Sequence, residues 1–187
     1  MNEKKEVVYD KHSKWFYLGQ AILSVITLRL FYDLFYLFAY FIVNHTMGVR
    51  LATIGKGSKI HPTVLVRHGE RVVLGKGCFI NHNNVLQGGK SKAKLILGDY
   101  VQTGPNVMMF AFNHGTKMNG IPMIEQDYLE ADTVIDDDVW VGGGTVIVAG
   151  VHIGKGCVIG ANSVVTKDLP ENYICAGVPC KPIKPRV

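Results

Sequence analysis

Charged residues are scarce in this chain of 187 residues, and its cysteines are few. Only 19% of the residues are charged, 48% are hydrophobic and the net charge is +5, which excludes an intrinsically disordered chain. The four cysteines form no CxxC pair and have no Cys/His spacing that would hold zinc. We therefore expect no metal and a reduced, cytoplasmic protein. The length fits one domain with an appended segment.

An apolar and aromatic run covers residues 15–43, and its only charged residues are Arg29 and Asp33. These two lie four apart, so they can pair on a helix. The run is long enough to span a bilayer, but the charges sit in its middle, where a spanning helix disfavours them. Three interpretations follow for the predicted N-terminal helical segment, 1–48: a helix or helical hairpin packed on the protein, an element in the membrane interface, or a span. The aromatic content and the pI near 9.0 favour the interface, peripheral at the inner face of the cell membrane.

From Ile54 onward an aliphatic residue recurs every six positions, often followed by Gly, with a small or β-branched residue in the fifth position. The cleanest frame reads Ile135, Val141, Ile147, Ile153, Ile159, Val165. A period of six predicts a parallel β-helix, in which three hexads make one triangular coil of about 18 residues. The first-position residues then point inward, and the second-position glycines permit corners with φ > 0. Cys78 and Cys157 occupy fifth positions, so we expect them to be small core residues.

The period breaks after Val66, after Leu86 and over the predicted inserted loop, 110–134. A long loop in a rigid repeat is where function concentrates. His114 opens this loop and is the candidate catalytic base. His82 precedes it by about two coils, so the two histidines could face one cleft. The repeat domain is predicted as 49–175, followed by a tail, 176–187.

Three motifs carry a family resemblance. They are Val139-Trp140-Val141-Gly142, the run from Ile159 to Pro170, and the run from Ala176 to Lys181. With His114 ahead of them, the chain resembles the hexapeptide-repeat acyltransferases, in the branch of the galactoside, maltose and xenobiotic O-acetyltransferases. The resemblance implies an all-β fold, a left-handed parallel β-helix, with an N-terminal apolar helical segment and a long inserted loop. It also implies a homotrimer with active sites between subunits, and acetyl-CoA as co-substrate.

The same resemblance implies roles for particular residues. His114 would take the proton of an acceptor hydroxyl, with Glu125, Asp127 or a backbone carbonyl orienting its ring. The Gly142-Gly143-Gly144 turn is the candidate oxyanion donor. The cofactor-binding residues would be Gly143, Ala161, Thr166, Lys167 and Lys181, with Trp140 beside the pantetheine arm or in trimer packing. The acceptor-binding residues would be Asn81, His82 and Asn83.

The acceptor is where the chain departs from its resemblance. Gln87-Gly88-Gly89 stands where galactoside enzymes carry an acidic pair, and the N-terminal segment is apolar rather than a short polar cap. These differences favour a surface polysaccharide, a lipopolysaccharide or a lipid-linked glycan as the acceptor. The alternatives are an N-acetyltransferase of an amino-sugar nucleotide, a three-histidine zinc enzyme of the β-helix carbonic anhydrase type, and a non-enzymatic scaffold. The excess of basic over acidic residues points to CoA phosphates and a membrane surface rather than to nucleic acid.

Overall fold

The computed structural model describes residues 12–187, which divide into two compact units between Phe41 and Ile42. The first unit contains α1 (Lys14–Ile26) and α2 (Leu28–Phe41), separated by Thr27 in an extended conformation. The Ser13 hydroxyl caps α1 by accepting the N–H of Phe16. The predicted pair forms on α2, with Arg29 Nε 3.0 Å from the Asp33 carboxylate.

Apolar side chains of α1 and α2 are largely exposed. Trp15 is 79% exposed and Phe35 71%, and α2 has no buried residue. Among the described residues no single helix is both long and apolar enough to cross a bilayer. The segments Lys14–Val25 and Leu28–Leu51, bent by 65°, meet that requirement only as a pair.

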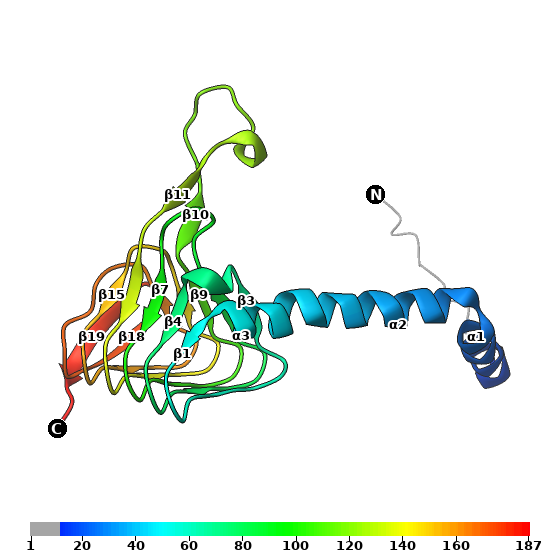
Figure 1. Cartoon of the computed structure of the whole chain (residues 1–187), viewed down its shortest axis with the longest axis horizontal. Helices are drawn as coiled ribbons and strands as arrows, with labels where there is room; N and C mark the ends of the chain where they lie inside the picture. Colours follow the sequence, from blue (N-terminus) through cyan, green and yellow to red (C-terminus); the bar gives the residue numbers. More distant parts are fainter. Residues whose placement is uncertain (1–11) are drawn as a thin grey trace, which may run out of the picture. The chain divides into compact units, whose positions relative to one another are not determined.

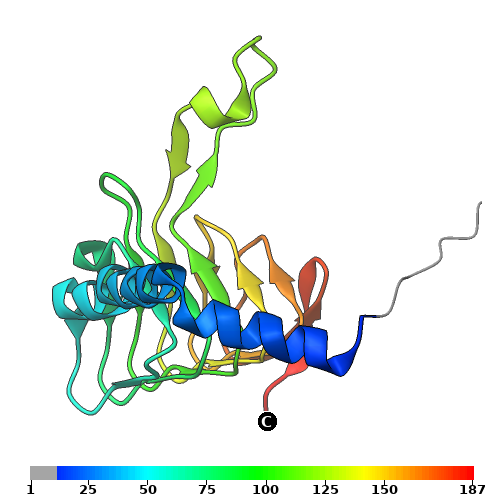
Figure 2. The same ribbon diagram turned by 90° about the vertical axis from the view of Figure 1, so that its right-hand side faces the viewer.

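The second unit begins with η1 (Ile42–Thr46) and α3 (Met47–Leu51), and continues as a β-solenoid with three sheets (Figures 1 and 2). The first sheet is β1 (Thr53–Ile54), β4 (Val72–Leu74), β7 (Leu95–Leu97), β12 (Thr133–Ile135) and β15 (His152–Ile153). The second is β2 (Lys59–Ile60), β5 (Phe79–Ile80), β8 (Gln102–Thr103), β13 (Trp140–Val141), β16 (Val158–Ile159) and β18 (Tyr173–Gly177), closed by antiparallel β19 (Cys180–Pro185). The third is β3 (Leu65–Arg67), β6 (Val85–Gln87), β9 (Met108–Phe110), β14 (Val146–Ile147) and β17 (Val164–Val165). Each coil adds one parallel strand to each sheet, which confirms the predicted parallel β-helix.

The first-position aliphatics form the core, as the period predicts. Ile135, Ile147 and Ile159 are 0% exposed, one on each sheet, and each pairs in register with a first-position residue of an adjacent coil. The fifth positions line the same interior, so Cys78 and Cys157 are core residues as expected. All four cysteines are free and buried, and burial raises the pKa of the Cys175 thiol to about 12. These thiols therefore stay protonated and are poor nucleophiles.

The predicted reason for the second-position glycines is wrong. Positive φ occurs instead at the fourth position of the hexads, for example at Gly57, Gly77 and Asn83. The second-position glycines are required by the close stacking of the coils. A Cβ on Gly75 would lie 2.5 Å from the Gly98 carbonyl carbon in the next coil and 2.6 Å from its oxygen. At each corner, the second position of the hexad is therefore crowded by the next coil, and the fourth position has a left-handed backbone.

Three excursions lie where the period breaks. The 3₁₀ helix η2 (Gly69–Arg71) follows β3, and a short loop joins β6 to β7. The third is a hairpin of β10 (Phe112–His114) and β11 (Tyr128–Glu130), with η3 (Met123–Glu125) near its tip. The hairpin projects from the solenoid in both views (Figures 1 and 2). Beneath it, β7 pairs directly with β12, with Leu95 opposite Thr133 and Leu97 opposite Ile135.

Candidate active site

His114 lies at the last position of β10, where the hairpin leaves the solenoid, and its side chain is exposed. It pairs in register with Tyr128 on β11, and the two rings lie 4.7 Å apart between centroids. An open groove runs from His114 over the third sheet. Its lining residues are Gln87, Phe110, Phe112, Asn113, His114, Val146 and Val148. The groove thus offers an imidazole at one edge of a largely apolar surface.

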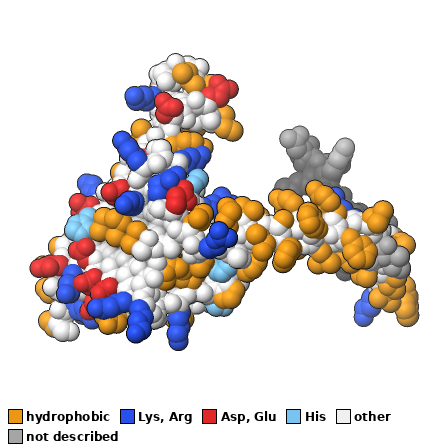
Figure 3. Space-filling view, in the orientation of Figure 1, with side chains coloured by type: hydrophobic (Ala, Val, Ile, Leu, Met, Phe, Trp, Pro, Cys, Tyr) orange, Lys and Arg blue, Asp and Glu red, His pale blue; other side chains and the backbone are white. Residues whose placement is uncertain are grey.

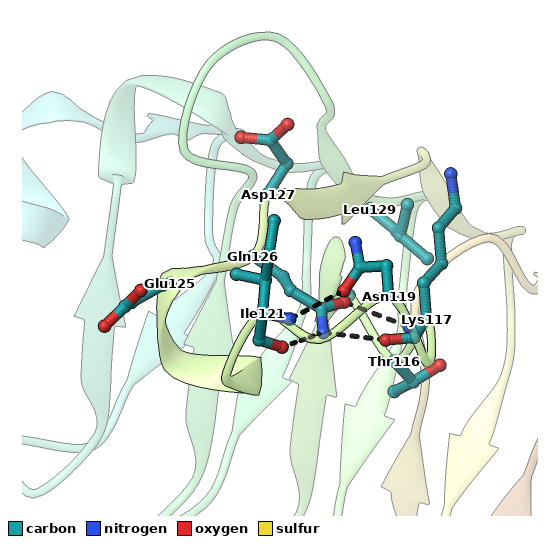
Figure 4. Close-up of a pocket in the computed structure, with 9 residues that line it drawn as sticks. Thr116, Lys117, Asn119, Ile121, Glu125, Gln126, Asp127 and Leu129 are labelled. Carbon is teal, nitrogen blue, oxygen red and sulfur yellow. Dashed lines mark hydrogen bonds between the residues drawn. The ribbon is translucent and has the colours of Figure 1, made fainter.

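The carboxylates considered as partners of His114 lie elsewhere. Glu125 and Asp127 line a second pocket farther out in the hairpin, with Gln126 between them (Figure 4). The Gln126 amide donates to the carbonyls of Lys117 and Ile121 at 2.9 and 2.8 Å, and so holds the tip of the hairpin together. Within residues 12–187 the His114 ring makes no hydrogen bond, and its observed contact is the Tyr128 ring.

Two of the predicted cofactor residues meet at the corner between the second and third sheets. Gly143 and Ala161 occupy this corner in successive coils, where the Asn162 N–H donates to the Gly143 carbonyl at 2.9 Å. The predicted acceptor residues stand in the same column of corners, two coils before Gly143. The His82 carbonyl accepts the N–H of Asn106, and the Pro105 carbonyl accepts that of Gly144. Asn81, His82 and Asn83 are therefore aligned with Gly143, not with the His114 groove.

Thr166 and Lys167 lie at the other end of the strands of the third sheet, just after β17. The Val148 N–H donates to the Val165 carbonyl, so Thr166 follows one coil beyond the groove residue Val148. The site residues of one chain thus form two columns. One column contains His114 and Thr166, and the other contains Gly143 with the acceptor residues.

The remaining two predicted cofactor residues lie on or beside the second sheet. Trp140 points outward from β13, is 55% exposed, and shares a shallow pocket with Tyr100, Val158 and Arg186. Lys181 is exposed on β19, opposite Ala176 of β18. In the described part of the chain, no group of three His, Cys, Asp or Glu residues could hold a metal ion.

Tyr128 and Glu130 lie beside the site but were not predicted from the sequence. Predicting a β-hairpin here would have put both residues beside His114 and Phe112, because Phe112-x-His114 and Tyr128-x-Glu130 alternate in the manner of two paired strands. Glu130 organises the loop between β6 and β7. Its carboxylate accepts the backbone N–H groups of Ser91, Lys92 and Ala93 at 2.7, 2.9 and 3.1 Å. These hydrogen bonds, that of Lys92 foremost, lower the pKa of the Glu130 carboxyl to about 2 from its ordinary 4.5.

We expect Glu130 to contribute stability that acid removes. A carboxyl whose pKa is lower in the folded state stabilises the protein fully above pH 4.5, and the contribution is lost as pH falls toward 2. A Glu130→Gln variant should unfold at a lower urea concentration at pH 7, and the difference from wild type should shrink by pH 2.5. Urea unfolding curves at both pH values measure this. An equal difference at both would show that the charge of Glu130 contributes nothing.

Comparisons with known proteins find relatives of this chain. The family described as "Bacterial transferase hexapeptide (six repeats)" matches residues 132–167. The galactoside O-acetyltransferase of Escherichia coli strain K12 is 33% identical over 137 residues, which is 71% of this chain and 63% of that protein. The 2,3,4,5-tetrahydropyridine-2,6-dicarboxylate N-acetyltransferase of Staphylococcus aureus strain Newman is 47% identical over 51 residues, 27% of this chain and 21% of that protein.

A solved structure agrees with these matches. The hexapeptide-repeat-containing acetyltransferase of Vibrio cholerae O1 biovar eltor, in complex with acetyl coenzyme A, superposes with a TM-score of 0.66 at 29% identity, over 76% of each chain. The chain spans about three-fifths of the length of the curated relatives it matches over long stretches. The stacked hexads, the corner glycines and these matches agree: over residues 132–167 the chain carries the repeat of the bacterial transferase hexapeptide family, on a solenoid similar to that of a hexapeptide-repeat acetyltransferase.

Proposed function

We propose that this protein is an O-acetyltransferase that moves an acetyl group from acetyl-CoA to a sugar hydroxyl on a surface polysaccharide, a lipopolysaccharide or a lipid-linked glycan precursor. The observation that carries the proposal is the exposed His114 at the edge of an apolar groove on a hexapeptide solenoid. The names of the relatives support the reaction class, since one is a galactoside O-acetyltransferase and another was solved with acetyl coenzyme A.

The chemistry follows from what these residues can do. His114 accepts the proton of the acceptor hydroxyl as its oxygen attacks the thioester carbonyl carbon. When the carbon–sulfur bond breaks, the imidazolium returns that proton to the departing thiolate. The Gly143 N–H suits the oxyanion between these steps. In the described structure the N–H groups of Gly142 and Gly144 already donate to the carbonyls of Ile159 and Pro105, whereas that of Gly143 donates to none.

Cofactor phosphates would meet the exposed ammonium groups of Lys167 and Lys181. We further propose that the active unit is a homotrimer with its sites between subunits. The two columns of site residues support this, because His114 and Gly143 lie at opposite ends of the strands of the third sheet, too far along them to act together in one chain. A second copy that lays its Gly143 column beside the His114 column of the first would bring them together.

A thiol-release assay tests the function. Acetyl-CoA is mixed with the protein and a panel of free sugars, nucleotide sugars, amino-sugar nucleotides and lipid-linked glycans, and CoA release is followed together with the mass of the protein in sedimentation. Turnover of hydroxyl acceptors by a trimer is the expected result. Turnover of amines alone would favour an N-acetyltransferase, the second candidate, which the 47% identity over 51 residues supports. An active monomer would refute the shared site.

We also propose that α1 and α2 lie in the inner face of the cytoplasmic membrane, where a lipid-linked acceptor would be presented. Their aromatic and aliphatic side chains are exposed on more than one side of each helix, which is typical of membrane segments rather than of a helix with one packing stripe. The Arg29–Asp33 pair lowers the cost of placing both charges near lipid, because each side chain partly neutralises the other.

Replacing Phe35 and Phe38 together with glutamate should lower binding to phosphatidylglycerol vesicles by more than about tenfold, since each buried Phe contributes roughly 1.5–3 kcal/mol. These side chains are 71% and 64% exposed. Cosedimentation with vesicles measures the effect. Met118→Glu is the control, because Met118 is fully exposed at the tip of the hairpin in the other unit. Equal vesicle binding by wild type and the double variant would exclude the membrane role of α2.

A further inference from the structure

Lys90 lies in a tightly held loop between β6 and β7, at the foot of the hairpin. The Arg71 guanidinium donates to the carbonyl oxygens of Gly89 and Lys90, both at 2.6 Å. Gly89 packs so closely on the loop that a Cβ there would lie 2.6 Å from the Ala93 carbonyl oxygen. Glu130 holds the other end of the loop from β11. The backbone that carries Lys90 is therefore fixed from two sides.

The Lys90 ammonium is directed at the aromatic rings beside His114. Its Nζ lies 3.3 Å from the centroid of the Tyr128 ring and 5.3 Å from that of Phe112. Because β10 and β11 pair in register, Phe112, His114 and Tyr128 project from one face of the hairpin. The Tyr128 ring contacts both the ammonium and the imidazole. The cation thus lies one aromatic ring away from the candidate base.

This cation has no anionic partner within residues 12–187. No carboxylate lies within ion-pair distance of Lys90 there, and its Nζ makes no hydrogen bond. The nearby Glu130 is occupied by backbone N–H groups. The same loop adds Lys92 and then Lys94, and basic side chains gather at the foot of the hairpin (Figure 3). Phe112 lies both under the ammonium and in the lining of the His114 groove, so the charge borders the groove.

We propose that Lys90 determines acceptor specificity by binding a phosphate or carboxylate that the acceptor glycan carries close to the hydroxyl to be acetylated. The proposal rests on the proposed O-acetyltransferase function and adds the charge of its substrate. An ammonium held on aromatic rings keeps N–H donors for an oxyanion, and an anion bound there would set the neighbouring hydroxyl near His114. The acceptor class is therefore an anionic glycan, such as a uronic acid or a sugar phosphate.

Matched acceptors test this. The thiol-release assay compares p-nitrophenyl glucuronide with p-nitrophenyl glucoside, and glucose 1-phosphate with methyl glucoside. We expect wild type to favour the charged member of at least one pair by about 10–100-fold in kcat/KM, as a charge-assisted hydrogen bond provides. Lys90→Met should abolish the preference while neutral acceptors change less than about twofold, and Lys90→Arg should restore much of it. Lys92→Met is the matched control, because Lys92 shares the loop but contacts neither ring. The two pairs separate carboxylate from phosphate recognition.

Three results would overturn the proposal. A wild-type preference for neutral acceptors, or a charge preference that Lys90→Met leaves unchanged, would leave the acetyltransferase intact and remove Lys90 from acceptor choice. A rise in KM for acetyl-CoA alone would assign the ammonium to the cofactor. Failure of every acceptor, charged and neutral, in protein whose thermal unfolding midpoint is normal would instead refute the proposed function itself.

Discussion

Replacing His114 with alanine is expected to lower kcat for acetyl transfer by about 10²–10⁴-fold, the usual contribution of a general base. A sugar hydroxyl is a weak nucleophile at neutral pH, and the groove offers an imidazole at its edge to take the proton. Binding of acetyl-CoA, measured by calorimetry, should stay within about twofold of wild type, because His114 acts on the acceptor proton.

His152→Ala is the matched control for that experiment. His152 is also an exposed histidine on the solenoid, and its Nε2 lies 2.9 Å from the Asp136 carboxylate. Surface ion pairs of this kind contribute at most about 1 kcal/mol to stability. The activity of the His152→Ala variant should therefore be near that of wild type. A His114→Ala variant with full activity would exclude the general-base mechanism, whatever the acceptor.

Gly75→Ala is expected to destabilise the solenoid by about 3 kcal/mol, at the upper end of the range for overpacking. The added methyl group would meet backbone atoms of Gly98 in the next coil at 2.5 and 2.6 Å, and backbone cannot move aside as a flexible side chain can. Relief would require two coils to separate, which weakens the hydrogen bond from the Gly75 N–H to the Leu97 carbonyl. Urea unfolding followed by circular dichroism measures the loss.

Gly57→Ala provides the comparison, because Gly57 has φ of +79° and no atom lies within 4 Å of where an added methyl group would stand. That variant should lose only about 1–2 kcal/mol, the cost of a left-handed alanine. The two glycines lie in neighbouring coils and differ in why the chain needs them. If Gly57→Ala proved the more damaging of the two, backbone conformation rather than stacking would be the dominant constraint on the corners.

The period of six was enough to predict the coils, because an inward row at every sixth residue is a local property of the chain. Ile135 to Val165 follow it without a slip and are buried as expected. The period could not say which position of a corner needs glycine for space and which for φ. Stacking distances between coils depend on residues about 20 positions apart, such as Gly75 and Gly98, and no single hexad contains that information.

His114 could be predicted as the candidate base, because it opens the long break in the repeat. The residues around His114 could not be predicted, because their contacts join loops that lie far apart in the sequence. Lys90 comes from one break, and Tyr128 from the far side of another, and only the folded hairpin brings them together. The separation of Gly143 and His114 at two different corners of the coil could not be predicted from the sequence either. Counting hexads does not give the distance between the two ends of a strand in the sheet.

The direct pairing of β7 with β12 makes the hairpin a detachable module. β12 pairs with β7 as β7 pairs with β4, although the hairpin is inserted only between β7 and β12, so the ladder holds the stack together while the hairpin provides the environment of His114. Such a layout separates selection for stability from selection for substrate. Apart from Glu130, which holds the loop between β6 and β7, residues of the hairpin can change in kind or number without disturbing the stack. Under the proposed function, exchange of this segment between solenoids would be a direct route to new acceptor preferences.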